Sequence, residues 1–240
     1  MSDPDFFVGY LGKVPRPLAL FNIRCGLALV ALFALAALAL GRGGDAEAGA
    51  AVFAGEDARL EGRIETLPYP LLRLPSGHAV LLAGDGKRGA QEIIRDFAGK
   101  SAKLEGYLLK RGTLDMLLPG PVSAAVALPD PVAAVSLGRW RAAGEICDGK
   151  CSTGAMHQGS GLAHKACANL CLAGGVPPVF ALASPLDGDS FALLADAAGG
   201  PVPPGALDLT ALPVELEGDV ERRGDLLVFK VDWDKARRTN

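Results

Sequence analysis

The longest unbroken apolar stretch of the chain, CGLALVALFALAALALG, covers residues 25–41 and lies between Arg24 and Arg42. It is at the short end of what crosses a bilayer, since about 20 apolar residues span the hydrocarbon core. The pattern predicts a single transmembrane helix over 25–41. An N-terminal segment over 1–24 would precede it and a linker over 42–57 would follow it.

The alternative to an anchor is a cleaved signal peptide, whose cleavage site would lie in the Ala/Gly-rich residues 46–54. The region before the apolar stretch contains prolines and the aromatic sequence FFVGY, which is bulky for a signal peptide and favours the anchor. Lys13, Arg16 and Arg24 precede the span, and cytoplasmic flanks carry such a basic excess. We therefore expect a bacterial inner-membrane protein with a cytoplasmic N-terminus and residues 45–240 in the periplasm.

Beyond the linker, short apolar runs with alternating polar positions are separated by Gly, Pro and Asp turns, a pattern typical of small β-barrels. Two stretches match without a gap, LEGYLLKRGTLDMLL at 104–118 and LEGDVERRGDLLVFK at 216–230. Each reads as a strand, a tight turn at Arg-Gly and a second strand, which indicates an internal duplication. We predict a mainly β protein with two tandem OB-fold-like small barrels, over 58–120 and 137–234.

The first copy fits the order of an OB fold, in which three strands precede a helix and a closing hairpin. The helix is expected over 91–98, where Ile93 and Phe97 have helical spacing. The expected strands of this copy cover residues 58–66, 71–75, 78–83, 101–110 and 113–118.

Composition and charge narrow the classes of function. Aromatic residues make up 6% of the chain and the net charge is −3 at pH 7. The part expected in the periplasm holds 25 acidic against 20 basic residues. Because single-strand binding needs a basic groove with stacking aromatic side chains, we expect no nucleic acid partner. The sequence also contains no nucleophile elbow, phosphate loop or HExxH motif.

Reactive side chains are concentrated at residues 147–171, CDGKCSTGAMHQGSGLAHKACANLC, which hold four of the five cysteines and two of the three histidines. If residues 161–173 are helical, His164, Cys167 and Cys171 share one face, because neighbours three, four and seven positions apart align. This Cys/His insertion, placed at 147–175, would interrupt the second barrel.

Three interpretations of the segment stay open. Exported cysteines usually form disulfides, so Cys147, Cys151, Cys167 and Cys171 can pair and staple the loop. Alternatively, Cys151, Cys167 and Cys171 join His164 in a tetrahedral metal site for a zinc or copper ion. Finally, Cys167 and Cys171 can be the reactive pair of a thiol-based oxidoreductase.

Five more residues complete the set of candidates. Lys150 adjoins Cys151 and can support the loop by hydrogen bonding or charge, and Asp148 can act in the same way. Cys147 is either a disulfide partner or an additional ligand. Met156 and His157 are further soft donors, of the kind that suits Cu(I).

The stretch GEICDGKC…HKACANLCLAGGVPPVF resembles a segment of uncharacterised exported or membrane-anchored bacterial proteins, with the pattern Gly-x-Ile-x-Asp-x-x-Cys, a loop, then Cys-x3-Cys and Gly-Gly. The resemblance implies an OB-like β-rich fold and an exported location, but no chemistry. Cys147 departs from the pattern, so three cysteines and His164 are shared, which fits three-thiolate ligation or one disulfide with a free thiol. The matching positions are Gly144, Ile146, Asp148, Cys151, Cys167, Cys171, Gly174 and Gly175.

These patterns favour a membrane-anchored, periplasmic, non-enzymatic binding or accessory module. Its Cys/His loop would be a metal-binding or disulfide-stabilised recognition site, and its partner a membrane protein complex, for example a redox assembly. The alternatives are a thiol-based oxidoreductase using Cys167 and Cys171, and a purely structural scaffold stapled by disulfides.

Overall fold

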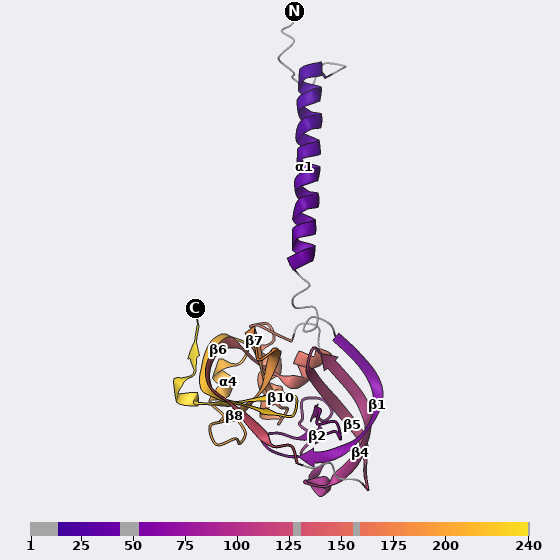
Figure 1. Ribbon diagram of the computed structural model, residues 1–240, viewed down its shortest axis with the longest axis vertical. Coiled ribbons are helices and arrows are strands. Elements are labelled where there is room, and N and C mark those ends of the chain that lie inside the picture. The colour runs from indigo at the N-terminus through magenta and orange to yellow at the C-terminus, as the bar shows by residue number, and fades with distance from the viewer. Residues whose placement is uncertain (1–13, 44–52, 127–130, 156–158, 240) are drawn as a thin grey trace, which may run out of the picture. The chain divides into compact units, whose positions relative to one another are not determined.

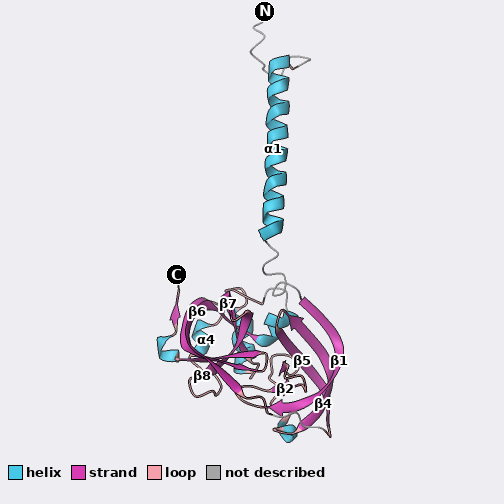
Figure 2. Ribbon diagram, viewed as in Figure 1, coloured by secondary structure: helices cyan, strands magenta, loops and turns pink. Residues whose placement is uncertain are grey.

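The computed structural model describes residues 14–43, 53–126, 131–155 and 159–239. The chain divides into two compact units, Met1–Ala48 and Gly49–Asn240. The described part of the first unit is one helix, whereas the second is built mainly from strands (Figures 1 and 2).

Helix α1 covers Arg16–Gly43 and is apolar around its whole circumference. Its 28 residues rise about 42 Å at 1.5 Å per residue, which is long enough to cross a bilayer. Its apolar window, Arg16–Ala39, has a mean hydropathy of 2.1. The helix starts earlier than the predicted span because Pro17 falls in the first turn, where its missing N–H costs no hydrogen bond. The predicted apolar helix is confirmed, while its orientation stays a prediction.

The first five strands form a closed barrel in the order β1-β2-β3-β5-β4. All neighbours are antiparallel except β3 and β5, which are parallel. The barrel core is formed by apolar side chains that alternate with polar residues along the long strands or fill the short buried ones. They include Ile64, Leu72, Leu82, Leu104 and Leu117. The strands are β1 Phe53–Glu65, β2 Leu71–Arg73, β3 Ala79–Leu82, β4 Ser101–Arg111 and β5 Leu114–Ala124.

A second sheet follows, in the order β10-β8-β7-β6-β9-β11 with an additional pairing of β10 with β9. The pairing of β8 with β10 is parallel, as in the first barrel, and the other pairings are antiparallel. The strands are β6 Ala134–Asp148, β7 Pro178–Leu186, β8 Asp189–Asp196, β9 Pro213–Arg223, β10 Leu226–Val231 and β11 Arg237–Arg238.

Four short helical segments connect the strands of this unit, in addition to the turn η3 described with the site. The prediction of a helix over 91–98 is wrong, since this stretch forms turns and a single 3-10 turn, η2. Only Ile94 in this stretch is fully buried, and a short helix needs more packing than this to be stable. The segments are η2 Arg95–Phe97, α3 Lys165–Ala173, α4 Ala206–Leu209 and η4 Trp233–Lys235.

The two sheets share a hydrophobic core. One cluster of buried residues joins Leu81 and Met116 of the first barrel to Val179 and Leu193 of the second sheet, and it also contains Cys147. The free energies of folding of the first barrel and of the second sheet therefore depend on each other, since burial of apolar area is the main favourable contribution.

Polar contacts cross the same boundary. The guanidinium of Arg73, which is fully buried, donates to the carbonyl of Arg223 at 2.8 Å and pairs with the carboxylate of Glu65 at 3.1 Å. Asp225, in the turn between β9 and β10, contacts Nδ1 of His78 in the first barrel and accepts from the backbone N–H of Ala79. The barrel and the second sheet are thus joined by both apolar and charged contacts.

His78 lies between two carboxylates. Its Nε2 lies 2.9 Å from Asp115, and its Nδ1 contacts Asp225. The hydrogen bond to Asp115, followed by that to Asp225, raises the pKa of His78 to about 9. Because the folded pKa lies above the usual 6.5 of the unfolded chain, this stabilisation is complete below about pH 6.5 and is lost as the pH rises through 9.

We predict that the difference in free energy of unfolding between the wild type and His78→Gln falls by about 1 kcal/mol between pH 6 and pH 10, after allowing for solvent screening of a partly exposed group. The measurement is urea unfolding at several pH values. The titration of the cysteines is common to both proteins and cancels in the difference. A difference that does not change with pH would contradict the assignment.

Candidate metal centre

The Cys/His segment connects β6 to β7. Its base is closed by a hydrogen bond from the N–H of Gly149 to the carbonyl of Pro177, at 2.8 Å. The short helical turn η3, Cys151–Ala155, comes next, and the hydroxyl of Thr153 donates to the carbonyl of Gly149 at 2.9 Å and so stabilises it. The predicted further donors, Met156 and His157, lie outside the described residues.

Helix α3 forms the second half of the segment and carries two of the cysteines. It ends at Gly174 and Gly175, where Gly175 has a φ of 90°, a conformation that favours glycine. His164 directly precedes the helix, and Ala168 and Cys171 are buried on the same side. The helix is shorter than the expected 161–173, but the predicted common face of His164, Cys167 and Cys171 is retained.

The candidate ligands converge from both halves of the segment. The ligand atoms of Cys151, His164 and Cys167 all lie within 4.8 Å of one another. Those of Asp148, Cys151 and Cys171 meet the same criterion. Cys151 belongs to both groups, so its sulfur lies at the centre of a cluster of five residues: one from η3, one from the end of β6 and three at the start of α3 or within it.

The thiols of the cluster form hydrogen bonds with one another. A hydrogen bond between Cys151 and Cys171 raises the pKa of Cys151 and lowers that of Cys171, and a further hydrogen bond from Cys167 also lowers the pKa of Cys171. All five cysteines of the chain lie in the described residues, and within these residues they are present as thiols and not as disulfides. Cysteines bind metal ions as thiolates, so binding of a soft ion here would displace the protons of these thiols.

Asp148 organises the cluster from the last position of β6. Its side chain is fully buried, and its Oδ2 lies 3.0 Å from Nε2 of His164. Its Oδ1 accepts from the backbone N–H of Cys151 at 2.9 Å. Because Nε2 of His164 is engaged by the carboxylate, the other ring nitrogen, Nδ1, is the one that can bind an ion. Asp148 thus contacts one candidate ligand, His164, and the turn that carries another, Cys151.

Cys147 has a different environment from the other three cysteines of the segment. It is 2% exposed, belongs to the shared hydrophobic core and donates to the carbonyl of Gly159 at 2.6 Å. Burial raises its pKa to about 12. Its sulfur lies within 4.8 Å of the ligand atoms of Asp148 and His164, and this group contains neither Cys167 nor Cys171. Its thiol is thus engaged by a backbone carbonyl, which fits a packing residue.

Two lysines connect the segment to the first barrel. Lys150 is buried, and its ammonium donates to the carbonyls of Gly84 at 2.7 Å and Gly86 at 2.9 Å. From the same loop, Nζ of Lys87 donates to Sγ of Cys167 at 2.7 Å, and this hydrogen bond raises the pKa of Lys87. Sequence reasoning missed Lys87 because it lies 80 residues before its partner. The only local signal is the Gly-rich sequence GDGKRG at 84–89.

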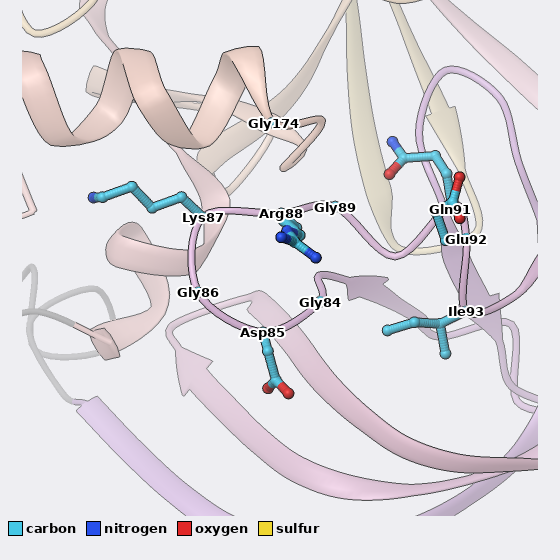
Figure 3. A pocket seen from close by; sticks show the side chains of 10 residues that line it. All are labelled: Gly84, Asp85, Gly86, Lys87, Arg88, Gly89, Gln91, Glu92, Ile93 and Gly174. Carbon is cyan, nitrogen blue, oxygen red and sulfur yellow. The ribbon is translucent and has the colours of Figure 1, made fainter.

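The loop that carries Lys87 also lines a surface hollow of about 810 Å³. Figure 3 shows that the side chain of Lys87 extends from this loop away from Gln91 and Glu92, which lie on the opposite side of the hollow. Lys87 lines one end of the hollow, and its ammonium is directed to Cys167.

We predict that, in native protein treated with a chelator, iodoacetamide modifies Cys167 first and Cys147 last among the four cysteines of the segment. Cys167 is half-buried, whereas Cys147 is fully buried and has a pKa of about 12. The rates should differ roughly 100-fold or more at neutral pH. Mass mapping of the modified peptides measures both rates, and unfolded protein, in which the rates should become similar, is the control. Equal rates in the native protein would contradict this description of the site.

Comparison of the chain with models of protein families, with curated proteins and with solved structures finds no match. The chemistry of the site is therefore inferred from its own residues.

Proposed function

We propose that the protein is a membrane-anchored metal-binding accessory module, in which Cys151, His164, Cys167 and Cys171 hold a zinc or copper ion. The observation that carries the proposal is the convergence of these soft donors around Cys151, with a buried carboxylate behind the histidine. Three thiolates and an imidazole are a recognised ligand set for tetrahedral zinc. Thiolates also bind Cu(I), so both ions suit the donor atoms.

The ligand set favours binding over catalysis. Catalytic zinc sites keep one position open for water or substrate, whereas sites with four protein ligands are structural. Here four residues are available, and His164 and Cys171 are almost fully buried. A bound ion would supply stabilisation of the loop between β6 and β7 and of the recognition surface that it forms.

A thiol-based oxidoreductase is the second candidate function. It is supported by the half-buried position of Cys167 beside the ammonium of Lys87 and by the lowered pKa of Cys171. Against it, Cys151 is a third thiol in the same cluster, and resolving pairs in disulfide oxidoreductases use the closer Cys-x-x-Cys spacing.

We also propose that the two sets of strands are OB-like barrels related by duplication. Both sets of five strands pair in the same succession, first with second, second with third, third with fifth, fifth with fourth and fourth with first. The matching sequences 104–118 and 216–230 both form a hairpin whose turn contains a glycine in the left-handed region, Gly112 or Gly224.

We further propose that α1 anchors these barrels in a bacterial inner membrane, with the N-terminus in the cytoplasm and the barrels in the periplasm. The apolar length of α1 and the basic residues before it support this orientation. The partner proposed for the module is a membrane protein complex, because an anchored protein meets its partners at the membrane.

We predict that the full-length protein in detergent binds one Zn²⁺ per chain, and that Cys171→Ser lowers the affinity by about 100-fold or more, since it removes a ligand. Competition with a chromophoric chelator measures the affinity. Cys147→Ser is the matched control, because a serine hydroxyl can replace the hydrogen bond to Gly159 and the affinity should stay unchanged. Equal affinities of the wild type and Cys171→Ser would contradict the proposed ligand set.

The orienting role of Asp148 makes a separate prediction. Asp148→Asn preserves the size of the side chain but weakens the hydrogen bond to His164, and partners of this kind contribute 10–100-fold to metal affinity. We expect a loss of about 10-fold in the same competition assay, with one ion still bound at saturation. An unchanged affinity would show that Asp148 has no role in orienting the ligand.

A further inference from the structure

We propose that Lys87, supplied by the first barrel, is a positioning residue of the metal centre in the Cys/His segment, and that the centre is therefore completed by both barrels. The inference rests on the proposed function. Its basis is the contact of 2.7 Å between Nζ of Lys87 and Sγ of Cys167, which is the half-buried member of the ligand set.

The loop that carries Lys87 is held from both ends of the Cys/His segment. Before Cys151, the ammonium of Lys150 binds two carbonyls of the loop, those of Gly84 and Gly86. After Cys171, the carbonyl of Gly174 accepts from the N–H of Gly89 at 2.8 Å. The segment thus contacts residues on both sides of Lys87.

Two glycines allow this close approach. A Cβ on Gly174 would collide with the backbone carbonyl of Lys87, and a Cβ on Gly89 would collide with the carbonyl of Gly175. The carbonyl of Gly175 also accepts from the amide of Gln91 at 2.9 Å. Such backbone contacts leave no room for side chains, so the position of Lys87 is set by the packing of the loop against the end of α3 and does not depend on the flexible side chain alone.

The charge of a loaded centre explains why an ammonium is useful there. Three thiolates, a neutral imidazole and a divalent ion have a total charge of −1, which is costly to place beside the buried side chains of Cys151, His164 and Cys171. Lys87 lies at the exposed edge of the cluster, next to the half-buried Cys167. The ammonium of Lys87 offsets this charge, and its N–H donates to the sulfur of Cys167. Hydrogen bonds of this kind withdraw electron density from the sulfur and tune the metal–ligand bond.

The neighbouring cation supplies a matched control. Arg88 follows Lys87 in the same loop and also lines the hollow. None of the hydrogen bonds described above between the loop and the Cys/His segment involves the side chain of Arg88. Removing Arg88 therefore removes one positive charge from the loop and leaves the contact with Cys167 in place.

The test is Co²⁺ binding to the full-length protein in detergent, followed by absorption spectroscopy, for the wild type, Lys87→Met, Lys87→Arg and Arg88→Met. We expect Lys87→Met to bind Co²⁺ about 10-fold more weakly and to shift the thiolate-to-cobalt charge-transfer band to lower energy. Lys87→Arg should recover most of the affinity and of the band position, and Arg88→Met should match the wild type.

The outcomes separate this inference from the proposed function. If the wild type binds Co²⁺ and Lys87→Met has the same affinity and spectrum, the role of Lys87 is wrong and the metal site stands. If Lys87→Met and Arg88→Met weaken binding equally without a band shift, general charge and not the contact with Cys167 is responsible, which also overturns the inference. If the wild type binds neither Co²⁺ nor Cu(I), the proposed function itself fails.

Discussion

The buried carboxylate of Asp148 is the contact on which the arrangement of the Cys/His segment depends. An isolated charge in the protein interior costs several kcal/mol, so Asp148 needs partners, and it finds them in the imidazole of His164 and the N–H of Cys151. These two partners belong to the two halves of the segment, on either side of residues 156–158. By binding both, Asp148 holds the turn η3 close to the start of α3, and this places Cys151 of η3 near the cysteines of α3.

The position of this site also explains why the barrel and the second sheet form one unit. The strand β6 that ends at Asp148 contributes Cys147 to the core shared by both sheets, and α3 contributes Cys171 to the same core. On the polar side, the first barrel extends its loop 84–89 to the segment, and Arg73 and His78 join the barrels elsewhere along the boundary.

Local patterns in the sequence predicted local structure well. The alternation along 104–118 and 216–230 predicted both hairpins, and the three- and four-residue spacing of His164, Cys167 and Cys171 predicted their common helical face. The apolar stretch predicted α1, although its exact start depends on the first turn at Pro17. The helix expected over 91–98 was wrong, because helical spacing of a few apolar residues does not reveal how little of that segment is buried.

The rest of the site could not be predicted, because it depends on contacts between distant parts of the chain. Lys87 reaches Cys167 only because the barrels share a core and Gly174 admits the backbone of the loop. The specific role of Asp148 requires knowing that the strand before it ends inside that core. Residue types and spacing therefore predict the candidate ligands, whereas tertiary packing decides which of their side chains lie together and which, like Cys147, hydrogen-bond elsewhere.

The most direct test of the central claim is the intact mass of the full-length protein, measured under native and denaturing conditions together with elemental analysis. The account predicts a native mass raised by one metal ion, which is lost on unfolding, and a denatured chain in which every cysteine is a thiol. A native mass without metal and lower by four hydrogens would mean that the four cysteines of the segment form two disulfides, and it would contradict the metal centre.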